Sequence, residues 1–193
     1  MAMIIPSPKY KRVPYNLKGL SWWQQIIVVL RTPPQLEVIE DWISTLENGL
    51  RIIIPKGFVT DGASIPAWLW WLISPFGPLL EAAILHDFGY QHGYLLSPFD
   101  IRQVYNLASM RMSAKHADKF EEYGDVIPVF VGKGQQFFDD LLRHVTIEAN
   151  GATVQANAAY KALRVFGHFA WDKYRKEGPG AFNSNSLGLP GGS

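Results

Sequence analysis

The chain has 193 residues, of which 48% are hydrophobic and 18% charged, and its formal net charge at pH 7 is +1. This length suits one globular domain with additional segments, and the near balance of charges argues against a polycationic protein that binds nucleic acid. Because the chain contains no cysteine, the sequence excludes disulfides, thiolate zinc sites, cysteine nucleophiles and iron–sulfur clusters.

Prolines at positions 6, 8, 14, 33 and 34 punctuate the first 35 residues, so residues 1–35 are predicted to form an N-terminal arm. Within it, only residues 22–30 have the composition of a short helix or strand. The first residues lack the apolar run of a signal peptide, and the aliphatic runs are far shorter than the roughly 20 residues that span a bilayer. We therefore expect synthesis in a cytoplasm, without an export signal or a transmembrane segment.

Residues 36–176 carry the periodic pattern of a globular domain, beginning with strands. Residues 36–45 and 50–55 are rich in Ile, Val, Leu and Trp, and Asn48-Gly49 between them favours a tight turn. These features predict a β-hairpin. The Gly, Asp, Ser and Pro content of residues 57–66 predicts a loop after it.

Helices are predicted for most of the remaining domain. The string LLEAAILHDFGYQH after Pro78 is a favourable helix, with proline near its first turn and Glu81 near its positive end. Further helices are predicted over residues 98–123, starting at Ser97-Pro98, over residues 135–150, and over about residues 152–176. The expected fold class is a mostly helical α+β domain with an N-terminal β-hairpin.

The C-terminal residues 177–193 read EGPGAFNSNSLGLPGGS and have too little apolar surface to fold alone. We expect this tail to contact another chain rather than to pack on its own domain.

The candidate functional residues begin with His86, Asp87 and Tyr90. On a helix, His86 and Tyr90 share one face, while Asp87 points about 100° away from them. Adjacent His and Asp side chains can therefore contact different neighbours, one acting on a water and the other holding a metal. Asp139, on a later helix, is placed to set a carboxylate behind the imidazole, where it would fix the tautomer and stabilise the imidazolium.

The loop upstream of this helix contains Asp61, Gly62 and Ser64, which together with Asp87 supply carboxylate and carbonyl oxygens. A hard cation such as calcium requires an oxygen-rich shell of this kind. A structural interpretation stays open beside it. In that interpretation Asp61 caps a turn, His86 is a hydrogen-bonded core histidine, and Asp87 pairs with an arginine such as Arg143.

Several strings follow the spacing of one protein family: GFVTDGASIP over residues 57–66, Trp70, SPFG over residues 74–77, and AAILHDFGY over residues 82–90. They resemble domain-of-unknown-function family 1353, whose members occur in tailed phages and prophages. The resemblance covers roughly residues 36–175. Residues 97–134 look like an insertion relative to the family, and the arm and the tail lie outside its pattern.

The string HDFGY is also similar, more distantly, to the active-site helix of phospholipase A2 enzymes. This resemblance implies that His86 is the general base for a water that attacks an ester, that Asp87 is a calcium ligand, and that Tyr90 is a supporting group. Asp139, or alternatively Asp140, would orient the histidine. The loop at residues 60–64 departs from the usual glycine-rich calcium loop.

These resemblances imply a minor virion or tail-associated component of a tailed phage or prophage, made in the host cytoplasm. Its partners would be other virion proteins, contacted through residues 1–35 and 177–193 in an oligomeric assembly, but not nucleic acid. The alternative is a calcium-dependent lipid esterase that the particle delivers. In that alternative the aromatic run PAWLWWLI at residues 66–73 would meet membrane lipid; otherwise the run is core or a subunit contact.

Overall fold

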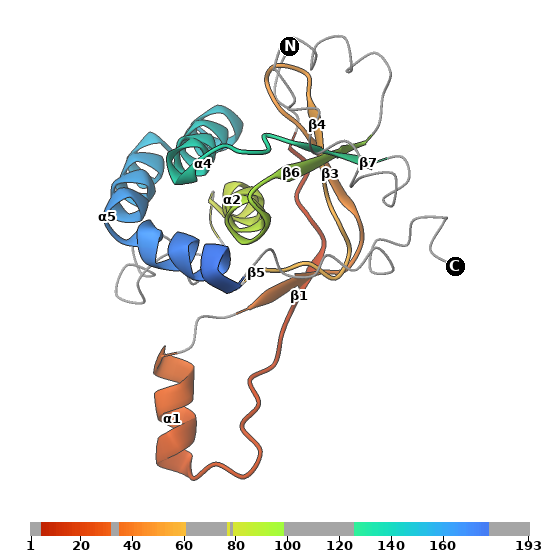
Figure 1. The fold of residues 1–193 in the computed structure, drawn as a ribbon. Helices are drawn as coiled ribbons and strands as arrows, with labels where there is room; N and C mark the ends of the chain where they lie inside the picture. Colours follow the sequence, from red (N-terminus) through yellow and green to blue (C-terminus); the bar gives the residue numbers. More distant parts are fainter. Residues whose placement is uncertain (1–4, 32–34, 61–76, 78, 99–125, 178–193) are drawn as a thin grey trace.

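The computed structural model describes residues 5–31, 35–60, 77, 79–98 and 126–177, which form four helices and seven strands (Figure 1). A three-stranded sheet has the order β1 (Tyr10–Arg12), β2 (Leu36–Val38), β5 (Val59–Thr60). A four-stranded sheet has the order β3 (Trp42–Thr45), β4 (Arg51–Ile54), β6 (Leu95–Pro98), β7 (Val126–Val129). All strand pairs are antiparallel.

Three helices pack together on one side of the strands: α2 (Leu80–His92), α4 (Gln135–Asn150) and α5 (Thr153–Glu177) (Figure 1). Helix α2 contacts both α4 and α5, and it also contacts β5 and β6. A fourth helix, α1 (Trp22–Arg31), lies apart from this group (Figure 1). The predicted α+β class is confirmed.

The predicted hairpin exists, but it is bent between the two sheets. Its turn joins β3 to β4, and Gly49 there adopts a φ of 83°. Both arms then cross into the other sheet, where they pair again as β2 and β5. The Asp41 carboxylate accepts a hydrogen bond from the Lys56 backbone N–H at 2.8 Å, and Gly57 has a φ of 85°. Both arms bend at this point, so residues 36–45, predicted as one arm of the hairpin, form two strands, β2 and β3.

The predicted helices over residues 79–92, 135–150 and 152–176 are confirmed as α2, α4 and α5, to within one residue at each end. Helix α2 is buried along most of its length, because nearly every position apart from Glu81 is apolar or faces the other helices. It ends at Gly93, whose φ of 78° places it in the left-handed region that favours glycine. Gly151, with a φ of 65°, ends α4 in the same way.

Four of the seven strands, β1, β5, β6 and β7, were not predicted. Strand β5 occupies the start of the predicted loop, and β7 lies within the predicted insertion, where it pairs with β6. The predicted helix start at Ser97-Pro98 is wrong, because both residues belong to β6, in which Leu95, Leu96 and Ser97 are buried. The rest of that predicted helix lies outside the described residues.

Part of the predicted N-terminal arm belongs to the domain. Strand β1 pairs with β2, and the indole N–H of Trp42 donates to the Pro6 carbonyl oxygen at 2.6 Å. The Ser7 hydroxyl donates to Glu81 at the start of α2, at 3.1 Å. Residues 178–193 lie outside the described residues. Within the described part of the chain, no helix combines the length and apolarity needed to cross a membrane.

Candidate functional site

His86 lies in the middle of α2 with both ring nitrogens beside carboxylates. Its Nε2 is 3.0 Å from Oδ1 of Asp139 on α4, and its Nδ1 is 3.3 Å from Oδ1 of Asp87. His86 is 1% exposed, Asp87 4% and Asp139 0%. The expectation that Asp139 sets a carboxylate behind the imidazole is confirmed, whereas exposed Asp140 has no place in this cluster.

Asp139 is the centre of the arrangement, because its two oxygens accept hydrogen bonds from three helices. Besides His86, Oδ1 accepts from the Tyr90 hydroxyl at 2.5 Å. Oδ2 accepts from Arg164 Nη1 on α5 at 2.9 Å and from Gln135 Nε2 at 3.4 Å. Tyr90 lies on α2 one turn after His86, with the two ring centroids 4.0 Å apart.

Asp87 is also engaged on both oxygens. Its Oδ2 accepts a hydrogen bond from the Thr60 hydroxyl on β5, while Oδ1 faces His86. We refer to the connected side chains as the buried polar network: Thr60, His86, Asp87, Tyr90, Gln135, Asp139 and Arg164. Of these, Arg164 is exposed at the surface and reaches inward to Asp139. The network joins β5, α2, α4 and α5.

The network contains two carboxylates and two cationic groups. Carboxylate oxygens only accept, so both nitrogens of His86 are placed to donate, and this arrangement favours the imidazolium form of the ring. Burial alone would lower the pKa of His86, but its hydrogen bonds to Asp139 and Asp87 outweigh burial and raise the pKa above the usual 6.5. Burial by itself would raise the pKa of Asp139, yet the bonds from His86 and Tyr90 hold it below 3.8.

Tyr90 is held in its neutral form. Burial, reinforced by the hydrogen bond to Asp139, raises the pKa of its hydroxyl well above the usual 10.0. The hydroxyl therefore stays a donor to Asp139 throughout the range in which proteins are stable. Gly167 on α5 makes room for this group, since a Cβ there would lie 2.6 Å from the Tyr90 hydroxyl oxygen.

This arrangement limits the chemistry that His86 can perform. A general base needs an unprotonated ring nitrogen within reach of the water that it activates. Among the described residues, one ring nitrogen faces Asp139 and the other faces Asp87, so neither is turned toward a site where a water could be activated. The geometry is suited to holding elements together more than to proton abstraction.

Stability should depend on pH through His86. Because its folded-state pKa is raised above 6.5, the charged ring contributes fully to stability below that pH, and the contribution is lost as the pH rises through the folded-state pKa. We expect the difference in unfolding free energy between wild type and His86→Gln to shrink from mildly acidic to alkaline pH. Urea unfolding of both proteins across this range measures it.

The contribution of His92 to stability depends on pH in the opposite direction. Burial, aided by Arg175, lowers the pKa of His92 to about 4. Its contribution to the free energy of unfolding is therefore present above pH 6.5 and is lost as the pH falls. Comparing the two proteins at each pH removes this effect. A stability difference that stays constant across the range would contradict the raised pKa of His86. Imidazole nitrogen NMR resonances of a neutral His86 ring below pH 6.5 would contradict it too.

The proposed calcium ligands are only partly described. Asp61, Gly62 and Ser64 lie outside the described residues, as do Trp68 and Trp70. Within the described ranges, no group of three or more His, Asp or Glu side chains is placed to hold a metal ion. Asp87 does not fit a calcium ligand as it stands, because it is buried and both its oxygens already contact Thr60 and His86.

Sequence reasoning missed Thr60, Gln135 and Arg164 as members of the network, and the interpretation that Asp87 pairs with Arg143 is wrong. Arg143 donates to Asn157 Oδ1 at 2.7 Å and lies over the Tyr160 ring. Arg164 follows Leu163 on α5, and the nearby small residues Ala159 and Gly167 are buried. In the sequence, the recurrence of Ala159, Leu163 and Gly167 at every fourth residue was the available signal that this part of α5 approaches the other helices.

Comparison with known proteins places the chain in a family. A family model described as "Protein of unknown function (DUF1353)" matches residues 36–163. The chain belongs to this family. The DUF1353 match includes His86, Asp87 and Asp139, but β1 and α1 lie before it and Arg164 directly follows it.

A curated relative is similar over a shorter stretch. The chain is 40% identical over 57 residues to "Uncharacterized protein y4jT" of Sinorhizobium fredii (strain NBRC 101917 / NGR234). The match covers 28% of this chain and 17% of that relative, so the chain corresponds to a minor part of the relative's length. No solved structure matches the chain.

Proposed function

We propose that this DUF1353 protein is a structural, partner-binding component of a tailed-phage or prophage particle, and that the buried polar network braces its domain. The observation that carries the bracing role is the saturation of His86 and Asp139, whose polar side-chain atoms all have partners within the protein. The particle is proposed from the resemblance of the chain to a family that occurs in tailed phages and prophages.

A bracing role is supported by the way the network connects elements that are distant in sequence. Thr60 on β5, His86 on α2, Asp139 on α4 and Arg164 on α5 form one chain of contacts. Removing one partner from a buried ion pair leaves an uncompensated charge, whereas in the complete network His86, Asp87 and Asp139 all have partners. Such a network holds α2, α4 and α5 in one relative position.

Partner binding is proposed for residues 1–35 and 177–193. The experiment is mass spectrometry of purified particles from a lysate in which the gene is expressed, with full-length protein and a variant truncated after Glu177. We expect the full-length chain in the particles and loss of the truncated chain, which should keep the unfolding midpoint of the full chain. Particles that lack the full-length chain would refute the proposal.

A second function, a calcium-dependent lipid esterase, is favoured by one observation. The 3.0 Å contact between His86 Nε2 and Asp139 is the pairing that orients a histidine base. This function would require Asp87 to give up its bond from Thr60 and a water to reach His86 Nδ1.

Calorimetric titration with calcium separates the two functions. We expect no calcium-dependent heat from the wild type at millimolar calcium and neutral pH, because both Asp87 oxygens are engaged. Asp87→Asn is the matched variant. Heat that appears in the wild type and disappears in this variant, together with ester hydrolysis that His86→Gln abolishes, would replace the bracing role with the esterase.

A further inference from the structure

Helix α1 carries an apolar face that the domain leaves uncovered. Figure 1 shows α1 away from the group of α2, α4 and α5, and it makes no extensive contact with another described helix or strand. Trp22 and Trp23 are 59% and 60% exposed, and Ile26 and Ile27 are 43% and 48% exposed. Large apolar side chains gathered in this way on one helix mark a binding surface.

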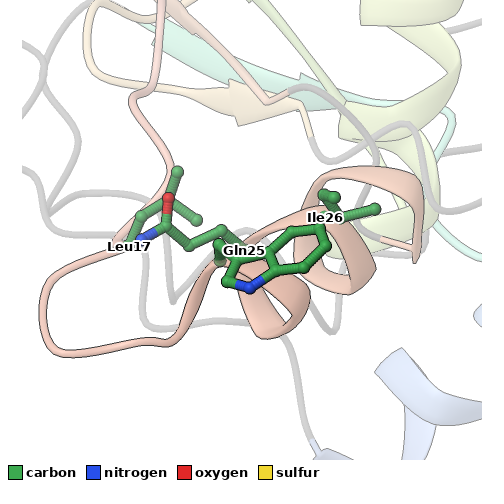
Figure 2. Close-up of a pocket in the computed structure, with 4 residues that line it drawn as sticks. Leu17, Gln25 and Ile26 are labelled. Atoms are coloured by element: carbon green, nitrogen blue, oxygen red, sulfur yellow. The ribbon is translucent and has the colours of Figure 1, made fainter.

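These four side chains form one continuous face, which we call the α1 apolar face. At about 100° per residue, Trp22, Ile26, Trp23 and Ile27 fall within an arc of about 140°. The two indole rings stack with centroids 3.6 Å apart. Beside the face, Leu17, Trp22, Gln25 and Ile26 line a shallow hollow of about 380 Å³, and Figure 2 shows Leu17 on the segment that precedes the helix.

The helix forms from local signals. Ser21 precedes its first residue, and the Gln24 side chain accepts hydrogen bonds from the Ser21 backbone N–H at 2.9 Å and from its hydroxyl at 3.0 Å. These bonds, one half of a capping box, form within the first turn and need no contact with the domain. A helix of 10 residues is nevertheless marginal in water, so a surface that covers the apolar face would stabilise it.

The charges around α1 are of one sign. The sequence has no Asp or Glu from Val13 to Gln35, while Lys18 precedes the helix and Arg31 is its last residue. Arg12, nearby in the chain, lies over the Tyr15 ring. Two copies of α1 facing each other would bring like charges together, so a second copy is disfavoured. An anionic surface with an apolar interior matches both the charges and the apolar face.

We propose that α1 lies on the surface of an anionic lipid bilayer, with the α1 apolar face inserted at the boundary between headgroups and acyl chains. Tryptophan favours this boundary, and basic side chains are attracted to the anionic headgroups. At about 1.5 Å per residue the helix is too short to span, so it lies in the plane of the surface. This goes beyond the proposed function, which concerns partners within the particle.

Vesicle flotation with the full-length protein tests this. Vesicles of phosphatidylcholine with phosphatidylglycerol should bind the wild type more strongly than vesicles of phosphatidylcholine alone. We expect Trp22→Gln/Trp23→Gln to bind at least about tenfold more weakly, because two large apolar side chains no longer insert. Lys18→Gln should bind the anionic vesicles about fivefold more weakly.

The matched control is Val165→Gln/Phe169→Gln on α5, which removes apolar side chains that are 58% and 68% exposed. This control should bind vesicles as the wild type does, and all variants should keep the wild-type unfolding midpoint because the changed residues lie outside the core. Wild-type protein that stays unbound, or a tryptophan variant that binds equally well, would overturn the proposal. So would a wild-type dimer that shows no vesicle binding and that the tryptophan variant dissociates.

Discussion

Asp139→Asn is expected to lower the free energy of unfolding by about 3 to 5 kcal/mol, the usual cost of removing one partner from a buried ion pair. Asp139 is fully buried and accepts from His86, Tyr90, Gln135 and Arg164. An asparagine amide would direct its own N–H groups at these donors and leave the His86 imidazolium without its main counter-charge. Urea unfolding followed by circular dichroism at neutral pH measures the change.

Asp140→Asn is the matched control, since Asp140 is the next residue on α4 and is exposed. It should change the unfolding free energy by less than about 0.5 kcal/mol. Equal effects of the two substitutions would show that the buried polar network does not brace the domain. The raised pKa of His86 should also fall in Asp139→Asn, because the hydrogen bond to Asp139 is the largest contribution that raises it.

Gly89→Ala is expected to destabilise the protein by about 2 kcal/mol, although alanine is the better helix former. A Cβ at Gly89 would lie 2.2 Å from Cδ1 and 2.4 Å from Cε1 of Phe138 on α4. Phe138 has no room to move, because it is fully buried and its ring packs against Phe137 and Trp171. The substitution should force α2 and α4 apart at the level of the His86–Asp139 contact.

Gly134→Ala provides the comparison for this substitution. Gly134 precedes α4 with a φ of −80°, and a Cβ there would meet no atom within 4 Å. We expect a loss of at most about 0.5 kcal/mol, from replacing glycine as the N-cap. If Gly89→Ala proved as stable as Gly134→Ala in thermal and urea unfolding, the close approach of α2 to α4 would be refuted.

The helices α2, α4 and α5 were predictable because their signals are local. Apolar periodicity over more than three turns indicates a helix, and Gly93 and Gly151 end two of them in the left-handed conformation. The hairpin turn at Asn48-Gly49 is local in the same sense. The bend of the hairpin was not predictable, because it depends on a contact between Asp41 and the backbone of Lys56 on the opposite arm.

The residues of the candidate site also fall into two groups, those with a local signal in the sequence and those without one. The spacing of His86, Asp87 and Tyr90 on one predicted helix was sufficient to select them, and the position of Asp139 on a later helix suggested that it would lie behind the imidazole. Thr60, Gln135 and Arg164 carry no comparable pattern, since polar residues are common on exposed loops and helix faces. Their roles arise only where β5, α4 and α5 meet α2.

Local patterns of apolar, glycine and capping residues therefore determined where the helices form. The sequence also indicated which charged residues, His86, Asp87 and Asp139, belong to the candidate site. Only the tertiary structure decided the charge state of that site. Packing between α2 and α4 places Nε2 of His86 against Asp139, 53 residues away in sequence, whereas Asp87, which faces Nδ1, is the next residue on α2. In a buried site the energy of each charge depends on every group around it, and no local stretch of sequence specifies those neighbours.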